Sequence, residues 1–521
     1  MSGTTDNLAG LAAAVLQPGF VGATRPPDWV RRWLGEGLGG VVLFARNVID
    51  HEQVAGLTAA MRAERPDVLV AIDEEAGDVT RLESRRGSSR PGNLALGAVD
   101  DPDLTEAVAR DLGAELAAAG ITLNYAPDAD VNADPDNPVI GVRSFGADPG
   151  LVARHTAAWV RGLQSAGVAA CAKHFPGHGD TSVDSHLDIP RIGVPRTRLE
   201  ACELPPFRAA IRAGVQAVMT GHLLVPAIDD EWPATLSRRI LTDLLREELG
   251  FQGAVVTDGI EMRAVTHRYG FTGAAVRALV AGADAICVGG EHAEEADAQR
   301  LRDAIVEAVT TGVLPEERLV EAAKRVGQLA AWSSTARAGR SAWDGPGPDG
   351  SPLGLAAARR AVRLTVGSGT AGSGLPLAGP AHVVEFAPPD NIATGSDTPW
   401  GVGLPLAALL PGTTTVRLTA DELGVDQLGT SGRLPAAVLV PAHGRPLVLV
   451  VRDLHRHEWM STAVHRVLAG RPDAIVVEIG VPETVVGQVH LATYGASWAG
   501  GRAAAEVLTG RAAVDVGVAA R

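Results

Sequence analysis

The sequence predicts an α/β protein, a (β/α)8 TIM barrel followed by a smaller C-terminal α/β domain. Two observations indicate the barrel: short apolar runs alternate with longer helical patterns, and eight such runs occur within roughly 300 residues. A third observation disfavours a doubly wound sheet, which has the same alternation. Polar residues stand at the carboxyl ends of several runs, and a barrel brings these ends together at one mouth, whereas an open sheet spreads them along an edge.

The expected strands are short, apolar and bounded by glycine, proline or polar residues, as is typical of strands that are buried on both faces. They are Ala12–Leu16, Gly40–Phe44, Val68–Asp73, Ile121–Ala126, Val168–His174, Ala217–His222, Ala254–Asp258 and Ala285–Gly289. Helical patterns lie between them; two begin after an Asp-Pro pair and several end at a glycine. The clearest are Glu52–Arg65, Asp103–Ala119, Leu151–Ala166, Leu199–Ala213, Arg238–Leu249 and Glu294–Thr311.

A stretch rich in glycine and proline, Gly345–Gly350, interrupts this pattern and has the composition of a linker. We therefore expect the barrel over residues 1–335, a linker over residues 336–356 and the second domain over residues 357–521. The second domain is expected to contain one helix and four strands. The helix is Trp459–Leu468, and the strands are His382–Phe386, Thr415–Leu418, Pro446–Val451 and Ala474–Ile479.

The chain has 521 residues, with 46 Lys and Arg against 61 Asp and Glu, so its formal net charge is −15. This acidic balance argues against nucleic acid or an anionic membrane as the main partner, because both attract basic surfaces. The three cysteines, Cys171, Cys202 and Cys287, are too few for a disulfide framework or a cysteine-based zinc site. The N-terminus lacks a basic signal-peptide start, and no apolar run reaches the roughly 18–20 residues of a spanning helix. We expect a cytoplasmic protein without a membrane partner; the sequence does not predict its oligomeric state.

The densest polar cluster runs from Lys173 to His186 and contains three histidines and two aspartates. One interpretation is a metal site, although His174 and His178 flank a Pro-Gly turn and lack the helical spacing of a zinc motif. A second interpretation is acid–base chemistry, because Asp184 and His186 are two residues apart and point the same way on an extended segment. A third is a loop pair that caps nearby backbone groups.

Other polar residues at expected strand ends have both a chemical and a structural interpretation. Asp258 can serve as a nucleophile or electrostatic stabiliser, or as an ordinary turn residue before glycine. Asp73 and Arg81 can bracket a ligand rich in hydroxyl groups, or can pair with each other. Arg143 lies in a long loop, where it can contact a ligand or can be an ordinary surface arginine. His222 ends the expected sixth strand. The sequence has no dinucleotide-binding, P-loop or serine-elbow motif. It therefore gives little support to a nucleotide cofactor or to a serine hydrolase mechanism.

The cluster reads K-H-F-P-G-H-G-D-T-S-V-D-S-H and matches the signature K-H-F/I-P-G-H-G-x4-D-S/T-H without a break. The first 335 residues thereby resemble the β-N-acetylglucosaminidases of glycoside hydrolase family 3. The strand-three motif around Asp73, the loop N-P-V-I-G-V-R-S-F-G around Arg143 and the strand-seven Asp258 follow in the family's order. The second domain is similar, more weakly, to that of the two-domain members. The resemblance implies a (β/α)8 barrel.

The resemblance also implies roles for individual residues. Asp258 is similar to the nucleophile, His186 to the general acid/base and Asp184 to its partner. The residues that resemble sugar contacts are Asp73, Arg81, Arg143, Lys173 and His174; His222 is expected to join them. Neither a metal nor a cofactor is expected. The positions that depart from the family pattern are Ala76, Asp78, Asp128 and Gly259.

The implied activity is that of a retaining exo-β-N-acetylglucosaminidase that acts on a small carbohydrate. Peptidoglycan fragments and chitooligosaccharides both fit as sources of the terminal N-acetylglucosamine (GlcNAc), which would place the enzyme in peptidoglycan recycling or chitin use. Phosphorolysis is an alternative, because a histidine base does not repel an incoming phosphate as a carboxylate does. Further alternatives are a β-glucosidase of the same family, a metal hydrolase and a sugar-binding protein without activity.

Overall fold

The computed structural model describes residues 2–181, 189–290, 292–337, 345, 347, 350–367, 374–389, 398–423 and 438–518. The chain forms two compact units. The first comprises Met1–Glu75, Pro102–Ile140 and Gly146–Gly345, and the second comprises Ala76–Asp101, Gly141–Phe145 and Pro346–Arg521. Two segments from inside the expected 1–335 region therefore belong to the second unit. The linear limits 1–335, 336–356 and 357–521 stay a prediction.

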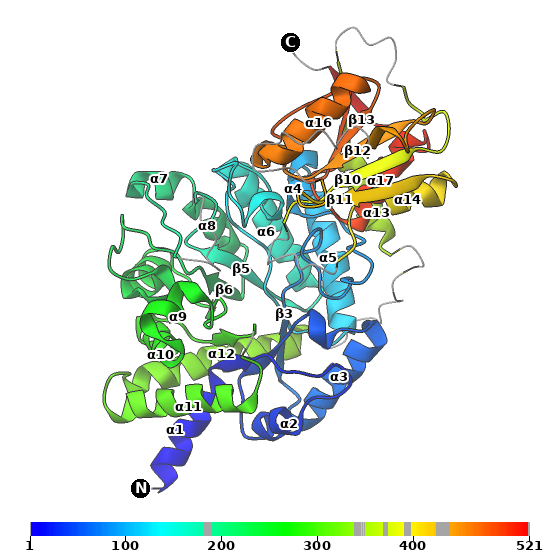
Figure 1. The fold of residues 1–521 in the computed structure, drawn as a ribbon. Helices are drawn as coiled ribbons and strands as arrows, with labels where there is room; N and C mark the ends of the chain where they lie inside the picture. Colours follow the sequence, from blue (N-terminus) through cyan, green and yellow to red (C-terminus); the bar gives the residue numbers. More distant parts are fainter. Residues whose placement is uncertain are drawn as a thin grey trace. The chain divides into compact units, whose positions relative to one another are not determined.

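The first unit is an α/β fold built on a curled parallel sheet (Figure 1). Six strands pair in sequence order: β2 (Gly40–Leu43), β3 (Leu69–Ile72), β4 (Leu123–Asn124), β5 (Ala169–Phe175), β6 (Ala217–Thr220) and β7 (Ala254–Thr257). Two more, β1 (Leu16–Pro18) and β8 (Ile286–Val288), pair with each other. A parallel bridge from Val256 to Ala285 connects the two sets, and the Gly39 amide donates to the Ala13 carbonyl at 3.0 Å.

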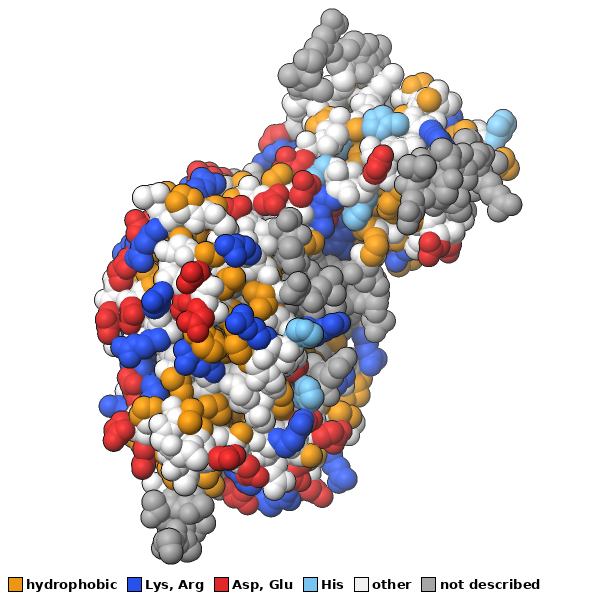
Figure 2. All heavy atoms as spheres, turned by 60° about the vertical axis from the view of Figure 1, so that its left-hand side comes forward, with side chains coloured by type: hydrophobic (Ala, Val, Ile, Leu, Met, Phe, Trp, Pro, Cys, Tyr) orange, Lys and Arg blue, Asp and Glu red, His pale blue; other side chains and the backbone are white. Residues whose placement is uncertain are grey.

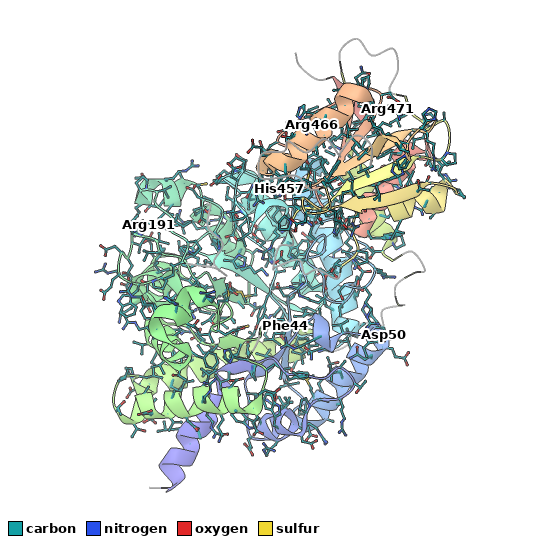
Figure 3. The ribbon with its side chains drawn as sticks, viewed as in Figure 1. Phe44, Asp50, Arg191, His457, Arg466 and Arg471 are labelled. Carbon is teal, nitrogen blue, oxygen red and sulfur yellow. The ribbon has the colours of Figure 1, made fainter. Side chains whose placement is uncertain are left out.

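Helices follow the strands of this unit. They are α1 (Ser2–Ala14), α2 (Asp28–Gly35), α3 (His51–Glu64), α5 (Pro102–Ala118), α6 (Pro149–Ser165), α7 (Arg196–Ala201), α8 (Leu204–Arg212), η4 (Arg239–Glu248), α9 (Arg263–Tyr269), α10 (Phe271–Ala281), α11 (Glu295–Thr310) and α12 (Glu316–Arg337). Short polar side chains begin several of them. The Asp50 carboxylate, labelled in Figure 3, accepts from the Gln53 amide at 2.8 Å, and Asp148 accepts from Leu151 at 2.6 Å.

Two sequence expectations for this unit were wrong in detail. The expected strand Ala12–Leu16 falls mostly in α1, because a five-residue apolar run does not distinguish a buried helix from a buried strand. The expected helix Leu199–Ala213 is two helices, α7 and α8. Prolines occupy the first turn of α8, where proline fits a helix start but would interrupt a continuous helix.

The strands of the first unit are buried along their whole length, as their apolar composition predicted. A core inside the curled sheet is formed by residues that include Val42, Leu69, Tyr125, Cys171, Met219, Val256 and Cys287, with Val326 and Leu329 from α12. All three cysteines are free and buried. Burial raises the pKa of the Cys171 and Cys287 thiols, which keeps them uncharged in this core.

The second unit is a seven-stranded sheet in the order β11–β10–β12–β13–β14–β9–β15. The strands are β9 (Arg363–Val366), β10 (His382–Phe386), β11 (Thr414–Leu418), β12 (Leu447–Val451), β13 (Ile475–Glu478), β14 (Val489–Ala492) and β15 (Asp515–Val518). All neighbours are parallel except β14 and β9. The four expected strands are present; β9, β14 and β15 were missed because they are short and stand beside polar or exposed residues.

Helices cover this second sheet, and buried apolar clusters lie on both of its faces. They are α4 (Asn93–Val99), α13 (Pro352–Ala361), α14 (Gly403–Leu409), α16 (Glu458–Gly470) and α17 (Trp498–Leu508). Helix α13 begins inside the expected linker, where Ser351 caps it by accepting from the Gly354 amide at 2.9 Å.

The described helices include none that is long and apolar enough to cross a membrane. Figure 2 shows acidic and basic side chains interspersed over the visible surface of the helices, without one sign of charge dominating.

Candidate active site

The carboxyl ends of strands β3 and β5 hold a buried lysine between two acids. The Lys173 ammonium, on β5, forms an ion pair with Asp73, one residue beyond β3, and a second one with Glu75 at 2.6 Å. Lys173 and Glu75 are almost fully buried, whereas the Asp73 side chain is 26% exposed. A buried ammonium requires such compensation. The arrangement therefore fixes Asp73 while leaving it accessible to a ligand; sequence reasoning foresaw Asp73 and Lys173 but missed Glu75.

His174, the next residue of β5, is oriented by an acid that follows β4. The Nδ1 atom of His174 lies 2.7 Å from the Asp130 carboxylate, which also accepts from the His178 amide at 2.7 Å. Burial by itself raises the pKa of Asp130, but the His174 charge and these hydrogen bonds outweigh it and lower the pKa. Asp130 thus stays ionised and holds the imidazole and the following loop in place. Sequence reasoning missed this aspartate because it is one of several in the loop after β4, and none has a recognisable spacing to His174.

Asp128 is a second buried acid beside the same imidazole. Its carboxylate lies 3.9 Å from His174 Nδ1 and accepts from the Asp130 amide at 3.0 Å. Ligand atoms of Asp128, Asp130 and His174 all lie within 4.8 Å of one another, and two carboxylates with one imidazole suit a divalent cation. Within the described ranges this is the one such group. Asp130 already bonds to His174 and to the His178 amide, so the geometry of these residues does not require a metal.

Asp258 stands directly after β7 and is half-buried. Its amide donates to the Thr220 carbonyl at 3.2 Å, and its carboxylate accepts from the Gly259 amide at 2.7 Å. His222, which follows β6, is buried and uses both ring nitrogens on the protein: Nδ1 on Thr235 Oγ1 at 2.8 Å and Nε2 on the Gly259 carbonyl at 2.9 Å. These two contacts make His222 a support for the segment that carries Asp258, and the substrate contact expected of His222 stays a prediction.

A second network lies at the ends of β2, β7 and β8, and sequence reasoning missed it. Glu261 accepts from the amides of Gly289, at 3.0 Å, and Gly290. The Arg46 guanidinium donates to the carbonyls of the same two glycines at 2.7 and 3.1 Å and lies over the Phe44 ring, labelled in Figure 3. Together Glu261 and Arg46 hydrogen-bond both the amide and the carbonyl groups of the backbone just after β8.

Glu203 lies at the start of α8, against the loop that follows β5. It is buried, and a Cβ added at Gly177 would overlap its carboxylate, so only glycine fits there. Burial, reinforced by the negative charges of Asp130 and Asp180, raises the pKa of Glu203 to about 8. Nothing in the sequence around Glu203 distinguished it from an ordinary helix-start acid.

The remaining expected residues belong to the second unit or lie outside the described residues. Arg81 and Arg143 belong to the second unit, where Arg81 is half-buried and the Arg143 carbonyl accepts from Asn93 at 2.7 Å. The partner of Asp73 described by the structure is Lys173, and the pairing of Asp73 with Arg81 stays a prediction. Asp184 and His186 lie outside the described residues, and their roles stay predictions.

Comparisons with known proteins identify the family. The glycosyl hydrolase family 3 N-terminal domain matches residues 19–329. Beta-hexosaminidase A of Pseudoalteromonas piscicida is 35% identical over 331 residues, which span 59% of this chain but only 55% of that relative. The beta-hexosaminidase of Stenotrophomonas maltophilia strain K279a is 42% identical over 270 residues, 50% of this chain and 78% of that protein.

Among solved structures, the chain is similar to a glycoside hydrolase family 3 beta-N-acetylglucosaminidase from Paenibacillus sp. str. FPU-7. The identity is 34%, the TM-score is 0.85, and the match covers 97% of both chains. The match therefore includes the second unit as well as the curled sheet, whereas the family model ends at residue 329. The family resemblance expected from the motifs is confirmed, and the chain belongs to glycosyl hydrolase family 3.

Proposed function

We propose that the protein is a retaining exo-β-N-acetylglucosaminidase. One observation carries the proposal: chemically active side chains stand at the carboxyl ends of four strands of one curled parallel sheet. They are Asp73 after β3, Asp130 after β4, Lys173 and His174 at the end of β5, and Asp258 after β7. In (β/α)8 barrels the substrate binds at this end. We further propose that the eight strands close into such a barrel.

The proposed chemistry takes place in two steps. The Asp258 carboxylate attacks the anomeric carbon and forms a glycosyl–enzyme intermediate, while His186 protonates the departing glycosidic oxygen. His186, then neutral, takes a proton from the water that hydrolyses the intermediate, so the configuration at the anomeric carbon is retained. Asp184 orients and charges the His186 imidazole. The accessible, backbone-anchored position of Asp258 supports the first step.

We propose that GlcNAc is held through its hydroxyl and N-acetyl groups. Asp73 and His174 are oriented by the buried side chains of Lys173 and Asp130, which suits them to bind sugar hydroxyl groups in a fixed geometry. Arg81 and Arg143 complete the set as hydrogen-bond donors. Terminal GlcNAc of peptidoglycan fragments or chitooligosaccharides is the proposed substrate, and the cytoplasm is the proposed location; cell fractionation tests the location.

A substrate panel tests the activity. Aryl β-GlcNAc and aryl β-glucoside are compared with and without inorganic phosphate, and the anomer first released is identified by NMR. We expect cleavage of the GlcNAc substrate, release of β-GlcNAc and no change of rate with phosphate. GlcNAc 1-phosphate as the product establishes phosphorolysis instead, and preference for the glucoside establishes a β-glucosidase. Full activity in EDTA rules out metal-dependent hydrolysis.

A further inference from the structure

Glu261 stands three residues beyond Asp258, in the turn that follows β7. Its Oε1 atom accepts from the amide of Gly289, at 3.0 Å, and from the amide of Gly290, and these are the first two residues after β8. Hydrogen bonds from backbone amides to a carboxylate are stronger than bonds between neutral groups. Asp258, Glu261 and both glycines belong to the first unit, so the contact lies within one compact body.

The turn that carries Asp258 is held between β6 and β8. On the β6 side, the Asp258 amide donates to the Thr220 carbonyl at 3.2 Å. On the β8 side, the Ile260 amide donates to the Cys287 carbonyl at 3.0 Å, and Glu261 adds its side-chain contact. Glu261 is joined to Asp258 by a stretch of chain that reaches at most about 10 Å. Losing the Glu261 contact therefore loosens the turn directly beside Asp258.

The two glycines after β8 allow a close approach of side chains to the backbone. A Cβ added at Gly289 would lie 1.8 Å from the Phe44 ring, so only glycine fits there. A Cβ added at Gly290 would lie 2.9 Å from Glu261 Oε1. A larger residue at position 290 would therefore push the carboxylate away from the amides that it binds.

Arg46 holds the other side of the same backbone. Its guanidinium donates to the carbonyls of Gly289 and Gly290 at 2.7 and 3.1 Å, and to the Phe20 carbonyl at 3.1 Å. Phe20 follows β1 and Arg46 follows β2, so these bonds tie the backbone after β8 to two further strand ends. Glu261 thus binds a segment that is itself fixed, and only a fixed partner can restrain the turn.

We propose that Glu261 is a positioning residue for Asp258, which it holds in place through hydrogen bonds to the backbone after β8. The inference rests on the proposed function, in which Asp258 is the nucleophile. Oε1 of Glu261 is engaged by the two amides and Oε2 is buried, so neither oxygen is presented to a sugar. The loss of Glu261 therefore slows the attack on the anomeric carbon more than it weakens binding of the sugar.

Glu261→Ala and Glu261→Gln form the first test. We expect alanine to lower kcat on aryl β-GlcNAc about tenfold to a hundredfold with KM within about twofold. Glutamine keeps an oxygen that can accept from both amides, so it is expected to recover a large part of this loss. Equal losses in the two variants would show that the charge matters rather than the hydrogen bonds, and overturn the inference. Glu106→Ala is the matched control, because Glu106 pairs with two arginines on surface helices.

Gly290→Ala tests the same contact without removing any of its atoms. Gly290 has no positive φ, so its backbone accepts alanine. The added methyl group displaces the Glu261 carboxylate and is expected to lower kcat severalfold. The double variant Gly290→Ala/Glu261→Ala is expected to have the kcat of Glu261→Ala alone, since the methyl group then meets no carboxylate. Losses that multiply in the double variant overturn the inference. Gly273→Ala, at an exposed glycine with open space around it, is the control.

Covalent labelling of Asp258 separates this role from a general loss of stability. A slowly hydrolysed 5-fluoro donor of GlcNAc is added, and the mass of the intact protein follows the glycosyl–enzyme; the melting temperature is recorded for every variant. We expect Glu261→Ala to be labelled more slowly in proportion to its kcat. A wild-type labelling rate in this variant overturns the inference, as does a loss that follows melting temperature alone. A wild type that is not labelled on Asp258 overturns the proposed function instead.

Discussion

The Nε2 atom of His222 lies 2.9 Å from the carbonyl oxygen of Gly259, the residue that directly follows Asp258. The other ring nitrogen lies 2.8 Å from Thr235 Oγ1, so the imidazole joins the loop after β6 to the loop after β7. A nucleophile works only within a narrow range of distance and angle to the anomeric carbon. The ring of His222 therefore supports the segment that carries Asp258, the proposed nucleophile.

Replacing His222 by phenylalanine keeps the ring volume and removes both hydrogen bonds. We expect kcat on aryl β-GlcNAc to fall about tenfold to a hundredfold with little change in KM, because a small displacement of Asp258 slows the attack. His155→Phe is the matched control, since His155 is also buried and bonded to a threonine, Thr105, at 2.8 Å. Equal kcat values for the two variants would show that the ring at position 222 contributes packing alone.

Asp258→Asn tests the nucleophile directly. We expect kcat to fall by about 10³-fold or more, because the amide cannot form the glycosyl–enzyme intermediate. Asp243→Asn is the control, because it makes the same change of charge at a half-exposed ion pair on η4, outside the proposed site. An Asp258→Asn variant with the kcat of the wild type contradicts the proposed mechanism.

Lys173→Met is expected to destabilise the first unit by about 3–5 kcal/mol, since it leaves the buried Glu75 without its partner and Asp73 without its support. Urea unfolding measures the loss. The double variant Lys173→Met/Glu75→Gln removes the orphaned charge together with the cation and is expected to be more stable than Lys173→Met. If the double variant is less stable than the single one, the buried charge is not the cause of the loss.

Glu203 makes stability depend on pH. Burial raises its pKa from the ordinary 4.5 to about 8. Between pH 4.5 and pH 8 the folded state therefore keeps a proton on this carboxyl that the unfolded state has lost. Stability is therefore fully present below about pH 4.5 and falls as pH rises toward 8, by roughly 1.4 kcal/mol per pH unit for one group.

The melting temperature between pH 5 and pH 8 checks this dependence. Glu203→Gln is expected to flatten the slope, because glutamine has no proton to lose. Glu478, buried at the end of β13, also has a pKa raised to about 8 and adds a slope of its own, so Glu478→Gln is the parallel variant. An unchanged slope in Glu203→Gln would mean that this carboxyl is already ionised near pH 5.

The residues at strand ends could be predicted because a parallel strand carries its own signal. A short apolar run followed by a polar residue is readable wherever it occurs, which is why the strand-end positions of Asp73, Lys173, His174 and Asp258 were predicted. The buried acids Glu75, Asp130 and Glu203 were not predicted, since an acid outside a strand looks the same in sequence whether it is buried or exposed. The end of α1 was misassigned for a similar reason: the local pattern suits a helix and a strand alike.

The sequence by itself determined the family, the alternation of strands and helices and the chemical groups at the strand ends, because each of these depends on neighbouring residues. Only the tertiary structure decided which charges meet. Lys173 pairs with Asp73 100 residues away, and Arg452 with Asp78 374 residues away. Such pairings depend on strand order and register and on the burial that makes an unpaired charge costly, and no local pattern encodes them.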